Sequence, residues 1–196
     1  MTGNAFGKWV RPVSSRGTEE LSIDERRYED GQDVKLLDLV EVAFKEPRPH
    51  ACQVENHLID DEHSWIRRGT IAASTLLPAA IASGPLWVDG FSSYGGENDR
   101  IPQADADQLP SSLILVVTEA ATFEVGSGFK KRQVRIRFRL GNRRYLLSVT
   151  DPKVETDYLG KPDGEYSFET RALVCVSLGE PFDGYRYKLV AGFVPI

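Results

Sequence analysis

Strict alternation of apolar and polar positions between Gln133 and Leu140 predicts a β-strand, because successive side chains of a strand point to opposite faces. A second alternating segment, Arg143 to Val149, follows after only Gly141 and Asn142. Glycine in the first central position is typical of a type II′ hairpin turn. The pattern therefore predicts a tight hairpin, which lies within a basic segment covering residues 130–149.

The elements around this hairpin predict a Greek-key barrel. A buried strand is expected at 112–118 with a continuation across 122–125, and further strands are expected at 172–178 and 185–194. Between the hairpin and the last two strands, Asp151 followed by Pro152 indicates an N-capped short helix over 151–159. Three strands, a helix and two strands is the element order of a five-stranded OB barrel.

The N-terminal half is also predicted to be β-rich. Strands are expected at 8–13 and 35–44, and an alanine- and leucine-rich helix, interrupted by Pro78, is expected at 71–83. Residues 91–110 form a polar, glycine-containing loop, so we place a domain boundary near residue 108. The expected domains are 1–108 and 109–196, and the expected fold class is all-β with minor helices.

Several short motifs carry a resemblance to a known family, and they are Gly7 to Val13, Leu37 to Val42, Gln53 to Asn56 with Trp65 downstream, and Tyr187 to Val190. Together they resemble the prokaryotic dual OB-containing domain, over nearly the whole chain. The resemblance implies two OB-like five-stranded barrels in tandem that recognise nucleic acid, in some members within anti-phage systems. Family members usually have one further strand before the Trp-x-Arg-Pro segment, so the resemblance leaves open whether the first barrel is complete.

Charge is concentrated in the predicted hairpin. Eight of the 24 Lys and Arg residues lie between Lys130 and Arg144, whereas none of the 29 acidic residues falls between Val125 and Thr150. The whole chain has a net charge of −5. A basic patch on an acidic body focuses its field on one place, which indicates a localised anion site.

The two-residue turn determines which side chains share a face of the hairpin. Alternating apolar residues face the core, while Arg135, Arg137, Arg139 and Arg144 face outward. The register sets Arg139 opposite Arg144, and like charges in that position destabilise a sheet. An anion lying across the hairpin would relieve this repulsion.

The sequence therefore predicts a nucleic-acid-binding module, with single-stranded DNA or RNA on the face of the second barrel's strands 2 and 3. The predicted contact residues are Arg135, Arg137, Arg139, Arg144, Lys130, Lys131, Arg132, Phe129, Tyr185, Tyr187, Trp9 and Arg11. One alternative is a protein interaction module whose arginines pair with an acidic partner or with the chain's own acidic half. Another is a sensor of a small anionic nucleotide. Pairing of the arginines with carboxylates of the same chain would argue against an external anion.

Other chemistry is weakly indicated. His50, Cys52, His57 and His63 fall close together, but their spacing matches no recurring zinc motif, so we expect no metal and no cofactor. No nucleophile elbow or phosphate-binding loop is found, so we expect no catalysis. Two widely separated cysteines and the absence of a long apolar run favour a cytoplasmic protein without a membrane segment.

Overall fold

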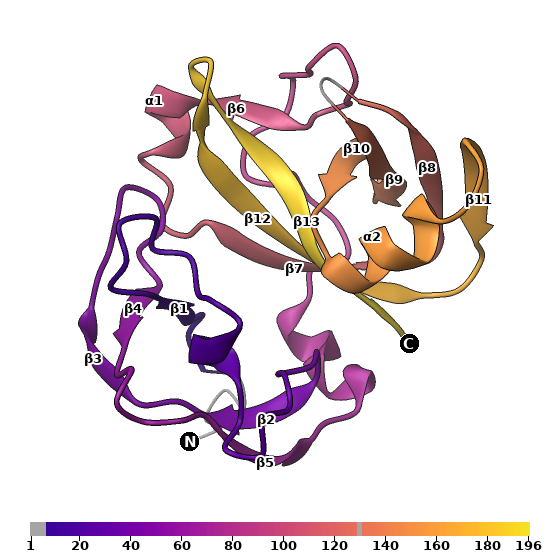
Figure 1. Ribbon diagram of the computed structural model, residues 1–196. Coiled ribbons are helices and arrows are strands. Elements are labelled where there is room, and N and C mark those ends of the chain that lie inside the picture. The colour runs from indigo at the N-terminus through magenta and orange to yellow at the C-terminus, as the bar shows by residue number, and fades with distance from the viewer. Residues whose placement is uncertain (1–6, 129–130) are drawn as a thin grey trace. The chain divides into compact units, whose positions relative to one another are not determined.

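The computed structural model describes residues 7–128 and 131–196, and its regular structure is predominantly β (Figure 1). The predicted all-β class with minor helices is confirmed. The chain divides into two compact units. The N-terminal unit runs through Leu76 and includes residues 110–112, and the C-terminal unit contains residues 77–109 and 113–196. No helix in the described part of the chain is long and apolar enough to cross a membrane.

The C-terminal unit contains the predicted OB barrel. Its main strands are β7 (Leu113–Thr118), β8 (Ala121–Ser127), β9 (Arg132–Leu140), β10 (Arg143–Val149), β12 (Ala172–Phe182) and β13 (Tyr185–Pro195). With the further strand β11 (Gly164–Phe168) at one edge, the sheet order is β11-β8-β9-β10-β13-β12-β7, and β10 runs parallel to β13. Because β7 and β8 are consecutive, they act as the two halves of a bent first strand, one half pairing with β12 and the other with β9. This closes the Greek-key order of an OB barrel.

The hairpin has the predicted register, with Leu140 opposite Arg143 and Arg139 opposite Arg144. Gly141 has a φ of +59°, the left-handed conformation that the first turn position requires. The inward side chains of β9 and β10, among them Ile136 and Tyr145, are buried in one hydrophobic core. The outward arginines are therefore oriented by burial of the alternate residues.

The helix after the hairpin, α2 (Pro152–Leu159), has the predicted cap, because the Asp151 side chain accepts hydrogen bonds from the backbone N–H of Lys153 and Val154. The helix lies beside one end of the barrel in Figure 1, and its Val154 belongs to the core. A short strand that the sequence pattern missed, β11 (Gly164–Phe168), follows and extends the sheet beyond β8.

Residues 77–109 pack with the C-terminal unit, whereas the sequence placed a boundary near residue 108. Leu86 is fully buried in the barrel core, and β6 (Arg100–Pro102) pairs with β13, followed by the short helix α1 (Gln103–Ala106). This segment has little periodicity of its own, so only tertiary packing reveals where it belongs. The helix predicted at 71–83 is instead the 3-10 segment η2 (Ala73–Ala79), since Pro78 cannot donate a helical hydrogen bond.

The N-terminal unit contains two short sheets. One has the order β1-β4-β3, from β1 (Arg11–Val13), β4 (Asn56–Ile59) and β3 (Phe44–Pro47), and the other pairs β2 (Asp38–Glu41) with β5 (Ile66–Thr70). The strand expected at 35–44 is thus split into β2 and β3, and a 3-10 turn, η1 (Asp24–Arg26), precedes them. Within the described residues of this unit, the pairing does not follow the closed order of the C-terminal barrel.

Candidate nucleic-acid interface

The outer face of β9 is a column of three arginines, and the neighbouring strands place acidic residues beside it. Strand β8 sets Glu124 directly opposite Arg135, and β11 sets Glu165 opposite Glu124. Glu124 forms ion pairs with both Arg135 and Arg137, and Glu165 lies 3.4 Å from the Arg137 guanidinium. The arginine column therefore lies beside a pair of carboxylates from two adjacent strands.

The remaining hairpin arginines are also paired, with one exception. Arg144 Nε lies 3.0 Å from Glu97, and Arg143 Nε lies 2.9 Å from Asp89. Arg132 Nε lies 2.7 Å from Asp163, and Nη1 of the same guanidinium donates to the carbonyl of Leu159 at the end of α2. The sequence has no acidic residue between Val125 and Thr150, but these arginines pair with carboxylates from segments outside that range, and this pairing argues against an external anion at the paired positions.

Arg139 is the exception. It is exposed, and it forms no ion pair with any residue that the structure describes. Directly opposite is Arg144, whose side chain is 62% exposed despite its contact with Glu97. The like-charged pair expected from the sequence therefore lies at the turn end of the hairpin, on the solvent side.

The other predicted contact residues are distributed over several places. Phe129 and Lys130 lie outside the described residues, and Lys131 is exposed. The Tyr185 ring lies 4.0 Å from the Arg100 guanidinium, and Tyr187 contacts Phe182 near the β12–β13 turn. Neither ring contact involves the arginine column.

Arg11 and Trp9 belong to the N-terminal unit. Arg11 donates to the Ser112 hydroxyl at 2.8 Å and lies 3.7 Å from the buried carboxylate of Glu55. Its side chain is only 21% exposed, so its contacts join β1 to residues 110–112. Trp9 is 42% exposed.

Sequence reasoning missed the segment Leu86 to Asp99, which lies along the open edge of β10. Only Ser148 and Val149 of β10 pair with β13, so the rest of that edge needs another partner. Glu97 supplies it, exchanging backbone hydrogen bonds with Leu146 of 3.0 and 3.2 Å. The Gly95 carbonyl also accepts a hydrogen bond from Arg135. The available signal was compositional, since this segment contains three acidic residues and no basic one.

A buried polar cluster anchors the beginning of this segment. Asp89 accepts hydrogen bonds from the Tyr145 hydroxyl at 2.9 Å and contacts the ammonium of Lys188, which also donates to the Val88 carbonyl at 2.7 Å. The Lys188 side chain is fully buried. Burial lowers the pKa of Lys188 to about 8, against the opposing attraction of Asp89. Burial also raises the pKa of Tyr145, and its hydrogen bond to Asp89 adds to that shift.

Lys188 leads to a stability prediction in alkaline solution. Its folded-state pKa lies below the value of about 10.4 for an unfolded lysine, so the folded protein releases this proton first as the pH rises. The free energy of unfolding should therefore increase by about 1 to 3 kcal/mol between pH 7 and pH 10. Above pH 10 it should fall, because burial and a hydrogen bond to Asp38 raise the pKa of Tyr28 to about 12.

Urea titrations at several pH values measure this dependence. The variant Lys188→Met is the control, and it should lose the rise between pH 7 and pH 10 while retaining the fall above pH 10. The same rise in the variant and in the natural protein would assign the effect to another group.

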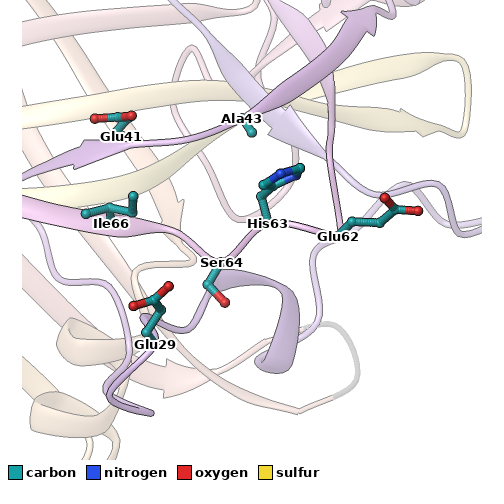
Figure 2. Close-up of a pocket in the computed structure, with 7 residues that line it drawn as sticks. All are labelled: Glu29, Glu41, Ala43, Glu62, His63, Ser64 and Ile66. Carbon is teal, nitrogen blue, oxygen red and sulfur yellow. The ribbon is translucent and has the colours of Figure 1, made fainter.

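The histidines do not assemble a metal centre in the described part of the chain, where no group of three potential ligands converges. His57 Nδ1 donates to the Glu55 carbonyl, and His63 contacts Asp60. A hollow of about 280 Å³ in the N-terminal unit is lined by Glu29, Glu41, Ala43, Glu62, His63, Ser64 and Ile66. Figure 2 shows the three carboxylates on different sides of this hollow rather than meeting at one point.

A comparison with models of protein families shows to which family the chain belongs. The model of the dual OB-containing domain matches residues 2–193. The chain belongs to this family. No curated protein and no solved structure matches the chain. Membership of the dual OB-containing domain family agrees with the strand order of the C-terminal barrel and confirms the suspected resemblance.

Proposed function

We propose that this member of the dual OB-containing domain family is a non-catalytic module that binds single-stranded nucleic acid at the turn end of the β9–β10 hairpin. The observation that carries the proposal is the exposed, like-charged pair of Arg139 and Arg144. In OB folds the ligand lies across strands 2 and 3, and β9 and β10 occupy those places in the barrel order.

The contact surface proposed here is smaller than the one expected from the sequence. Arg135 is only 22% exposed and is held by Glu124 and the Gly95 carbonyl, so we assign it a structural role. Arg137 pairs with Glu124, whose side chain is only 13% exposed and would lose a partner, so we assign Arg137 a structural role as well. Arg144 and its partner Glu97 are 62% and 35% exposed, and exposed ion pairs contribute only about 0 to 1 kcal/mol. Phosphate can therefore replace Glu97 at Arg144 at little cost. Arg139 forms no ion pair with a described residue, so no carboxylate has to leave before it contacts a phosphate.

Salt dependence of oligonucleotide binding tests this surface. Each phosphate contact to a single strand contributes roughly −0.7 to the slope of log K against log salt. Replacing Arg139 and Arg144 together with serine should make the slope less steep by about 1.4 units and weaken binding at low salt. Fluorescence anisotropy with a labelled oligonucleotide of mixed sequence measures both quantities.

Arg132→Ser is the matched control, because it also removes one hairpin arginine but one that contacts Asp163 and the end of α2. It should leave the slope within a few tenths of the natural value. A double variant with an unchanged slope would exclude the turn end as the contact surface. Absence of binding by the natural protein at low salt would exclude the function itself.

The two alternatives predict different competitors. An acidic protein partner would use the same arginines, and a polyglutamate peptide should then compete as well as an oligonucleotide of equal charge. A sensor of a small anionic nucleotide needs a pocket that favours anions, whereas the hollow described above is lined by three glutamates. Affinity that rises with oligonucleotide length would favour the proposed open surface over such a pocket.

A further inference from the structure

The loop from Gly90 to Arg100 is a rigid platform rather than a loose connection. The Asn98 side chain accepts from the Gly90 N–H at 2.7 Å, and the Asp99 carboxylate accepts from the Ser93 N–H at 2.7 Å. The ends of the loop meet where the Arg100 N–H donates to the Phe91 carbonyl. A compact loop whose ends are close and whose polar groups bond one another loses little entropy when it binds a ligand.

Close packing holds the tip of this loop in place. A Cβ atom at Gly96 would lie 2.0 Å from the Asp99 carboxylate, so no other residue fits there without displacing Asp99. A Cβ at Gly95 would lie 2.9 Å from the Arg135 guanidinium, and the Gly95 carbonyl accepts a hydrogen bond from that group. The loop tip therefore lies directly against the arginine column of β9.

Tyr94, the residue before these glycines, is fully exposed, with a relative accessibility of 109%. The exposed aromatics Phe182 and Trp9 reach only 60% and 42%. Consecutive Cα atoms are about 3.8 Å apart, so Tyr94 is next to the residue that contacts Arg135. A rigid loop thus presents an uncovered aromatic ring next to Gly95, at the Arg135 end of the column, which is about 13 Å along β9 from Arg139.

We propose that Tyr94 is a base-stacking residue, whose ring receives a nucleobase of the strand that the β9–β10 arginines hold by its phosphates. This inference rests on the proposed function and adds the chemical class that the site reads, a base rather than the phosphate chain alone. Aromatic rings stack on any base, so the contact increases affinity without specifying sequence. Because the tyrosine is uncharged, it contributes nothing to counterion release.

One experiment can therefore distinguish the stacking contact of Tyr94 from the phosphate contacts of the arginines. Tyr94→Ala should weaken binding of a mixed-sequence oligonucleotide about 5- to 150-fold, the range for loss of one stacked base, while the salt slope stays unchanged. Tyr94→Phe should bind like the natural protein, because it keeps the ring. Binding of an abasic oligomer of equal length should be the same for the natural protein and for Tyr94→Ala.

Phe182→Ala is the matched control, since it removes another exposed ring from the same unit. It should leave the affinity within about twofold. Equal affinities for Tyr94→Ala and the natural protein would overturn the stacking role alone, and so would an equal loss on the abasic oligomer. If the natural protein binds neither oligomer, the proposed function fails as well, so the two failures are distinguishable.

Discussion

Replacing Asp89 with alanine is expected to lower the free energy of unfolding by about 3 to 5 kcal/mol, the usual cost of breaking a buried ion pair by removing one partner. The reason is that Lys188 is fully buried and Asp89 is the carboxylate that its ammonium contacts. The substitution also removes the acceptor for the Tyr145 hydroxyl and the partner of Arg143. Three polar groups are thus affected together.

Urea denaturation at pH 7 measures this loss. Asp163→Ala is the control, because it removes an aspartate that pairs with a hairpin arginine at an exposed position, and it should cost less than about 1 kcal/mol. Adding Lys188→Met to Asp89→Ala should recover much of the stability, since the buried charge is then gone. A loss below 1 kcal/mol for Asp89→Ala would show that Lys188 does not depend on this carboxylate.

Replacing Phe123 with alanine is expected to cost about 3 to 5 kcal/mol as well, from lost apolar burial and the cavity that remains. Phe123 on β8 is 1% exposed. Its ring stacks on Tyr158 of α2, with centroids 4.2 Å apart, and meets the edge of Phe193 on β13 at 5.0 Å. The residue therefore joins the helix to two strands of the barrel.

Chemical denaturation followed by circular dichroism tests this expectation. The same chemical change at Phe182, which is 60% exposed near the β12–β13 turn, should cost less than about 0.5 kcal/mol. Similar losses for the two variants would mean that the Phe123 ring does not join α2 to the barrel core.

The arginine hairpin shows what a sequence pattern can predict and what it cannot. Alternation and a two-residue turn predicted which side chains face outward, and the register confirmed it. The same pattern could not predict that Glu124, immediately outside the segment without acidic residues, would lie opposite Arg135. Pairing between β8 and β9 is a non-local contact, so local charge counts overestimate the net charge of the surface. The site that remains for an anion is the end near Arg139.

The sequence by itself determined the five main barrel strands through their hydrophobic pattern, and the hairpin turn and the capped helix through their turn and cap residues, because each depends on residues close together in the chain. Tertiary structure alone decided that residues 77–109 belong to the C-terminal unit, since Leu86 is buried there without any repeating pattern. It also decided which arginines are neutralised and that Gly95, the residue after the exposed Tyr94, contacts Arg135. These features depend on contacts between distant segments, which burial and hydrogen bonding select only once the barrel has formed.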